Sequence, residues 1–193
     1  MKYTFYAMVL LFAAAQSASA EQPIQFANLP WGVTRAETKQ SLVDEGFTFE
    51  KLDDDGDLMF SGIIPTLGER AVVVAYFAPD DKLVKVDVNI APPDRRVLEV
   101  YRSVKESLTE LYGQPTREVE RFSYPYANVA GDVGREITAI RDGKAMIACL
   151  WGGHPPQDGL ALDVTDQLLA RVSYESARWS EELARRKKLA NGF

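Results

Sequence analysis

The segment VAYFAPDDKLVKVDV, Val74 to Val88, contains two apolar runs separated by the turn-forming stretch PDDK at positions 79–82. In the second run, apolar residues at even positions from 84 to 90 alternate with polar residues at 85, 87 and 89. A period of two is typical of a β-strand with one buried and one solvated face. The segment therefore predicts an antiparallel hairpin made of Arg70–Ala78 and Leu83–Ile90.

A second segment repeats this pattern 86 residues later. LALDVTDQLLARVSY, Leu160 to Tyr174, aligns with Val74–Val88 and keeps the alternation throughout. Upstream, Leu58–Ser61 has a counterpart in Ala145–Trp151. We interpret the chain as a tandem repeat of one helix followed by about four antiparallel strands, which is an α+β fold. Generic hairpin patterning is the alternative explanation of the match.

Three helices complete the prediction. The first runs from Arg35 to Glu45, because Thr34 and Glu37 have the spacing of a capping box. The second runs from Arg95 to Tyr112, with Asp94 as its cap and a glycine after its end. A short C-terminal helix is expected in the tail.

The chain divides into four parts. Residues 1–20 have Lys2, an apolar run over 5–15 and Ala18-Ser19-Ala20, the pattern of a cleaved export signal. We predict a first half over 21–92, a second half over 93–176, and a helix and tail over 177–193. The apolar run is shorter than the roughly 20 residues that a membrane span needs. We expect a periplasmic or secreted protein in a bacterium, without stable membrane insertion.

Charge and cysteine content exclude several classes. Removing Lys2 leaves 21 Lys+Arg against 28 Asp+Glu, a formal charge of −7. This balance argues against nucleic acid or anionic lipid as a partner. The single cysteine, Cys149, permits no intramolecular disulfide and lies in the apolar run 145–151. We therefore expect a buried, unreactive thiol.

The acidic run LDDDGDLMFSG, Leu52 to Gly62, begins like a calcium loop. With Gly56 at the sixth position of an EF-hand, the first position is Lys51 and the twelfth is Gly62. Because the first and the bidentate ligands are both missing, we predict a hairpin turn rather than a metal site.

Candidate site residues are few. His154 is the only histidine, and it follows Trp151 in a segment predicted to be a loop. Tyr124 and Tyr126 lie in RFSYPYANVAGDVGRE (121–136), predicted to be a loop between strands. Tyrosine is favoured at interfaces, so Tyr124, Tyr126, Trp151 and His154 are the partner-binding candidates. We predict no catalytic residues, no metal and no cofactor.

Three segments of the chain resemble segments of known proteins. Trp31-Gly32-Val33-Thr34, Tyr112-Gly113-Gln114-Pro115 and the closing strand 170–176 resemble uncharacterised exported bacterial proteins. Their helix-plus-sheet units are similar to those of beta-lactamase-inhibitor-like proteins and of the SmpA/OmlA group of outer-membrane assembly lipoproteins. The resemblance implies the fold and carries over no functional positions. The chain departs from the lipoprotein group in having no lipid-bearing cysteine.

The expected function is non-enzymatic binding of a protein or envelope component. The first alternative is a small-ligand carrier, which predicts an apolar pocket of at least about 300 Å³. The second is a small hydrolase that uses His154, which predicts a carboxylate or nucleophile within about 3.2 Å of that side chain. The sequence leaves the oligomeric state open.

Overall fold

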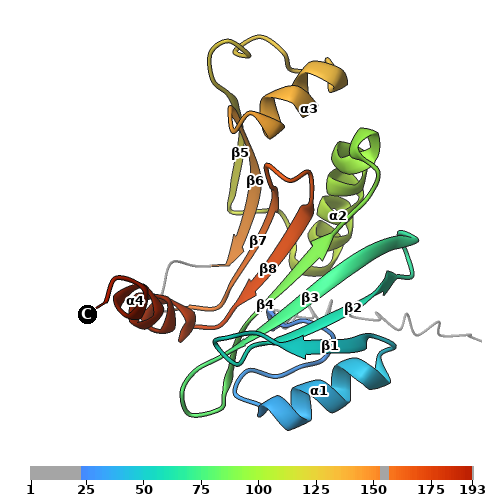
Figure 1. Ribbon diagram of the computed structural model, residues 1–193. Helices are drawn as coiled ribbons and strands as arrows, with labels where there is room; N and C mark the ends of the chain where they lie inside the picture. Colours follow the sequence, from blue (N-terminus) through green and yellow to red (C-terminus); the bar gives the residue numbers. More distant parts are fainter. Residues whose placement is uncertain (1–22, 153–156, 193) are drawn as a thin grey trace, which may run out of the picture.

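The computed structural model describes residues 23–152 and 157–192 (Figure 1). The predicted signal peptide, residues 1–20, and the candidate His154 lie outside these residues. The described residues form four α-helices and one antiparallel sheet of eight strands, which confirms the α+β class. The helices are α1 (Arg35–Asp44), α2 (Val97–Tyr112), α3 (Val133–Arg141) and α4 (Trp179–Ala190). The strands are β1 (Thr48–Leu52), β2 (Leu58–Ile64), β3 (Glu69–Phe77), β4 (Leu83–Ile90), β5 (Arg117–Phe122), β6 (Ala145–Gly152), β7 (Gly159–Val164) and β8 (Ala170–Glu175).

The sheet consists of two four-stranded meanders that meet in the middle. The strand order is β1-β2-β3-β4-β8-β7-β6-β5, and β4 pairs antiparallel with β8. The predicted hairpins over 70–90 and 160–174 are present as β3–β4 and β7–β8. Both edge strands, β1 and β5, are rich in charged residues, which blunts them against pairing with another chain.

Several local predictions are confirmed. Thr34 and Glu37 form the capping box of α1, an arrangement that stabilises the helix by about 1 kcal/mol. Gly113 ends α2 at φ 78°, a conformation that glycine adopts at little cost. The acidic run forms the turn between β1 and β2, where the Asp53 side chain accepts hydrogen bonds from the backbone N–H groups of Asp55 and Asp57.

Three local predictions are wrong. The segment 121–136 is not simply a loop, because β5 extends to Phe122 and α3 begins at Val133, capped by the Asp132 side chain. A 3-10 turn over Asp94–Arg96 precedes α2, and Asp94 pairs with Arg141 instead of capping the helix. Trp151 is not a loop residue, because β6 continues to Gly152.

The sheet has one thoroughly buried face, here called the inner face. Side chains from both meanders form a single hydrophobic cluster on it with α1, α2 and α3. Phe60 and Leu162, from opposite halves of the sheet, are fully buried there. Cys149 is also buried on this face, as expected, and its thiol lies 3.1 Å from the Tyr101 hydroxyl. Burial raises the pKa of the Cys149 thiol, so little reactive thiolate forms.

Candidate functional site

The opposite face of the sheet, here called the outer face, is covered by α4 at one end (Figure 1). It carries the side chains that alternate with the inner set, including Val72 on β3 and Leu150 on β6, each 39% exposed. The exposed residues Ile63 and Met146 lie on the same face, by their register with neighbouring strands. The two faces therefore differ in how completely they are covered.

An aromatic contact docks α4 on this face. The Trp179 ring lies 5.4 Å from the Tyr76 ring, centroid to centroid, and it packs with Ala78 and Val84 in a cluster separate from the main core. Lys85 lies over the Trp179 ring at 4.8 Å, a cation–π distance. The first turn of α4 is therefore anchored on β3 and β4.

A buried ion pair holds the last part of α4. The Arg186 guanidinium donates to both carboxylate oxygens of Asp57 and to the Phe77 carbonyl oxygen, the last at 2.9 Å. Asp57 has no exposed surface and also accepts the Phe77 backbone N–H at 3.0 Å. The final aspartate of the acidic run therefore connects the β1–β2 turn to the C-terminal helix.

Glu182 extends this network. It accepts hydrogen bonds from Arg185 and Arg186, and its side chain is 3% exposed. Burial raises the pKa of Glu182, but the two arginines outweigh burial and hold the pKa below its usual value. For Tyr76 beneath the helix, burial and the nearby Asp87 carboxylate raise the pKa. The charges of Asp57, Glu182, Arg185 and Arg186 are therefore paired with one another.

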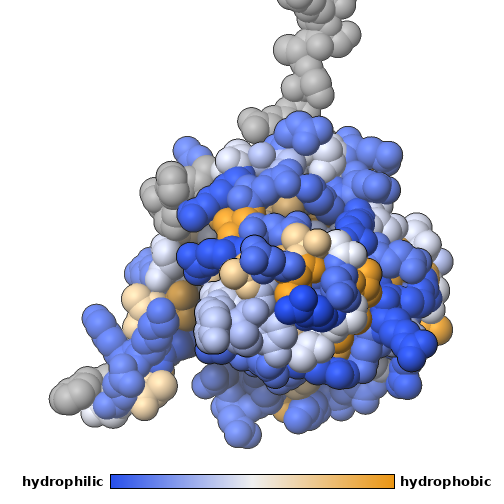
Figure 2. Space-filling view, turned by 90° about the horizontal axis from the view of Figure 1, so that it is seen from above, coloured by the Kyte–Doolittle hydropathy of each residue, from blue (hydrophilic) through white to orange (hydrophobic). Residues whose placement is uncertain are grey.

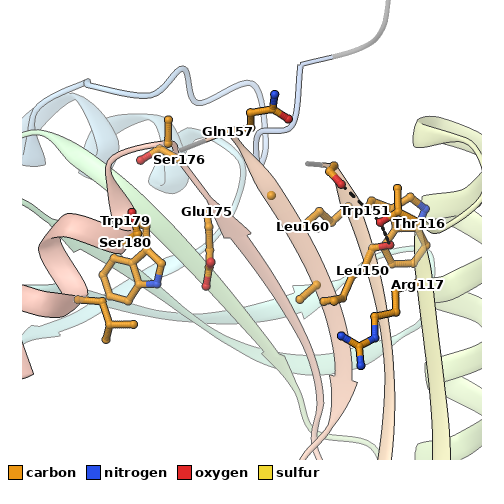
Figure 3. A pocket seen from close by; sticks show the side chains of 15 residues that line it. Thr116, Arg117, Leu150, Trp151, Gln157, Leu160, Glu175, Ser176, Trp179 and Ser180 are labelled. Carbon is orange, nitrogen blue, oxygen red and sulfur yellow. Dashed lines mark hydrogen bonds between the residues drawn. The ribbon is translucent and has the colours of Figure 1, made fainter. Parts of the chain in front are cut away.

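A cavity of about 620 Å³ lies beside α4 on the outer face (Figure 3). One wall is formed by Trp179 and Leu183 of α4, and the other by Thr116 and Arg117 at the start of β5. Its floor is formed by strands β8, β7 and β6. The small residues Gly159 and Ala161 in the middle strand make the floor deep.

Gly159 makes the floor deep because it has no side chain, although its backbone conformation does not require glycine. A Cβ atom built there meets nothing within 4 Å, and its φ lies outside the left-handed region. Gly152, its pairing partner, differs: its φ is 88° and a Cβ would lie 2.6 Å from the Asp158 carbonyl oxygen. A side chain at position 159 therefore has room to grow into the cavity, whereas position 152 requires glycine.

The polar groups of the cavity lie at opposite ends. Glu175 on β8 pairs with Lys85 at 3.2 Å, and Lys85 also contacts Asp87 at 3.2 Å. Arg117 on β5 forms no ion pair with any of the described residues. Ser176 also lines the cavity, and its buried hydroxyl has no hydrogen-bond partner among the described residues.

The structure describes three of the four predicted site residues, Tyr124, Tyr126 and Trp151, and His154 lies outside the described residues. Tyr124 is 88% exposed and follows the far end of β5, away from Arg117. The Tyr126 hydroxyl donates to Asp142 at 2.6 Å. Trp151 is 3% exposed, and its indole N–H donates to the Gly113 carbonyl oxygen at 2.9 Å. It is nevertheless one of the residues that line the cavity. The role of these residues as partner contacts stays a prediction.

Apart from Trp151, the sequence analysis missed the residues that form the cavity. Trp179 was read only as part of a terminal helix, although a lone aromatic in its first turn was a usable sign of docking. No local pattern marked Arg117, because it differs in nothing from the other charged residues of an edge strand. Gly159 carried a weak signal, since a glycine that begins a strand often leaves space above it.

No family model, curated protein or solved structure matches the chain. Within residues 23–152 and 157–192, no group of three or more His, Cys, Asp or Glu side chains is arranged to hold a metal ion. None of the helices in that part of the chain is both long enough and apolar enough to cross a membrane.

Proposed function

We propose that this is a non-enzymatic binding protein of the bacterial periplasm that takes up a small, largely apolar molecule in the cavity beside α4. The observation that carries the proposal is the cavity itself. Its volume of about 620 Å³ falls within the 300–1,000 Å³ that is usual for small-molecule sites. The periplasmic location rests on the export-signal pattern of residues 1–20.

The lining supports uptake of an apolar body. Leu150, Ala161 and Leu183 present aliphatic surface, and Trp179 adds an aromatic wall. Within the part of the chain that the structure describes, most charged side chains under α4 are already paired, which leaves no free acid and base there for catalysis. Binding through this site fits the envelope component that the sequence analysis named as a possible partner.

We also propose that the two meanders descend from one duplicated unit. Support comes from the central strand pair, where Asp87 pairs with Ser173 and the two positions differ by 173 − 87 = 86 residues. Val88 likewise pairs with Val172, the position 86 residues after Val86. The 86-residue offset found in the sequence therefore also separates two residues that pair with each other on the central strands β4 and β8.

The test uses N-phenyl-1-naphthylamine, a neutral dye whose fluorescence rises in apolar sites. We expect one dye molecule to bind each wild-type chain and each chain with Gly159→Ala, because the added Cβ has room. Gly159→Phe should abolish binding, since its ring would occupy the cavity. Equal binding by wild type and a folded Gly159→Phe variant would refute the proposed site.

A further inference from the structure

The cavity has an electrostatic polarity that restricts what it can bind. Register places Glu175 beside Gly159, Gly159 beside Gly152, and Arg117 beside Leu150. The cavity thus spans three strand spacings, roughly 14 Å at about 4.8 Å each. Glu175 stands at one end of this span and Arg117 at the other.

Among the described residues, the end at β8 presents no unpaired cation to the cavity. Lys85 is shared between Glu175 and Asp87, at 3.2 Å from each, so this group of three carries a net negative charge. Trp179 and Leu183 lie beside it and are apolar. An anionic group would be repelled here, whereas an apolar chain would find surface to cover.

The end at β5 has the opposite charge. Among the described residues, Arg117 has no carboxylate partner, and Figure 3 shows its guanidinium extending from β5 toward β6. A guanidinium presents a planar set of donors that matches a carboxylate or phosphate. The neighbouring Thr116 hydroxyl is engaged with the carbonyl oxygens of Leu150 and Gly152, at 3.1 and 3.4 Å. Arg117 is thus the charged donor available to a ligand at this end.

We infer that the ligand is an amphipathic organic anion whose carboxylate, phosphate or sulfonate group pairs with Arg117 while its apolar body lies over Leu150, Gly159 and Ala161 toward Trp179. This inference rests on the proposed binding function and adds the chemical class and orientation of the ligand. It also explains how a chain of net negative charge can hold an anion, since Arg117 and Arg121 lie on the outer face of β5 and the two glutamates of this strand lie on the opposite face.

The test compares two dyes with the same aromatic body. 8-Anilinonaphthalene-1-sulfonate is N-phenyl-1-naphthylamine with one added sulfonate, so the ratio of their dissociation constants isolates the charge. Arg117→Gln should weaken the sulfonate dye about tenfold or more relative to wild type, as expected for loss of a charged hydrogen bond. It should weaken the neutral dye much less than the sulfonate dye, because the neutral dye has no anionic group to pair with Arg117.

Arg121→Gln is the matched control. Arg121 lies on the same strand and the same face, four residues from Arg117 and outside the cavity lining. Both variants remove one positive charge, so a general charge effect would weaken the sulfonate dye equally in both. Equal weakening would overturn the inference, whereas weakening confined to Arg117→Gln supports it.

Displacement of the neutral dye identifies the preferred head group. Dodecanoate or dodecyl phosphate should displace it at lower concentration than dodecanol, and the order between the two anions distinguishes carboxylate from phosphate recognition. A preference for dodecyltrimethylammonium, or equal action of dodecanol and both anions, would overturn the inference. If no dye binds at all, or Gly159→Phe has no effect, the proposed cavity function fails instead.

Discussion

The inner and outer faces of the sheet are formed by the same strands but are buried to different extents. Phe60 on the inner face has no exposed surface, whereas Val72, on the next strand but the opposite face, is 39% exposed. Three helices close the inner face, but α4 covers the outer face at one end only (Figure 1). Seen from above, the molecule has a mostly hydrophilic surface interrupted by smaller hydrophobic patches (Figure 2). The contrast indicates that the inner face stabilises the fold and that the outer face is available for binding.

Truncation of an inner-face aromatic should have the largest effect. Phe60→Ala removes a ring that packs edge-on against Phe49 at 5.6 Å between centroids. We expect the free energy of unfolding, measured in guanidinium chloride, to fall by about 3–5 kcal/mol. Val72→Thr, on the outer face, should change the unfolding free energy by about 0.5 kcal/mol or less. Similar losses in both variants would erase the distinction between the faces.

Removal of the α4 anchor should come next. Arg186→Met leaves the buried Asp57 carboxylate without its cation, which should cost about 3 kcal/mol. The emission of Trp179 should also shift to longer wavelength as the helix detaches. The double variant Asp57→Asn, Arg186→Met should recover part of the loss, because no buried charge then remains. Strictly additive losses would show that the pair is not coupled.

A smaller effect is expected from acid. The folded state lowers the pKa of Glu182 below its ordinary value of 4.5, so the native carboxylate binds its proton less readily than the unfolded one. Its stabilising contribution is present above about pH 4.5 and is lost as the pH falls through the lowered pKa. Stability measured against pH should therefore fall less steeply below pH 4.5 in Glu182→Gln than in wild type. Identical slopes would contradict the assignment.

Two neighbouring positions can compare the exposure of the two faces through the reactivity of a thiol. Cys149 is 1% exposed on the inner face, and Leu150, the next residue, is 39% exposed on the outer face. A thiol reagent should leave Cys149 unmodified in the native protein and modify it after unfolding. A cysteine introduced by Leu150→Cys, with Cys149→Ala alongside, should react readily in the native state. Fast native modification of Cys149 would contradict the predicted burial.

Much of the fold could be predicted from local patterns. The alternation over 83–90 predicted β4 with its observed bounds, and the spacing of Thr34 and Glu37 predicted the start of α1. The short helix α3 was missed, because its nine residues include only a few apolar positions and follow a loop-like run of tyrosine, proline and glycine. Local patterns are strong where burial alternates regularly and weak where an element is short.

The candidate site was less predictable. The cavity depends on which strands become neighbours, and the pairings of β8 with β7, β7 with β6 and β6 with β5 bring Glu175 and Arg117 to the same face. Arg117 becomes a candidate ligand contact only because no carboxylate among the described residues pairs with it. Of the aromatic residues that looked most like a binding surface, Tyr124 lies at the far end of β5, whereas Trp151 is buried and is among the residues that line the cavity.

The most direct test of the binding site is a nuclear magnetic resonance titration of the ¹⁵N-labelled protein with dodecanoate. The indole N–H signal of Trp179 is a single reporter, and Figure 3 shows its nitrogen on the side of the ring that faces Glu175. We predict that this signal and the backbone amides of Gly159 and Ala161 shift together and saturate at one equivalent, while the amide of Tyr124 stays unchanged. Shifts confined to other residues, or no saturable shift at all, would contradict the central claim that the cavity beside α4 is the binding site.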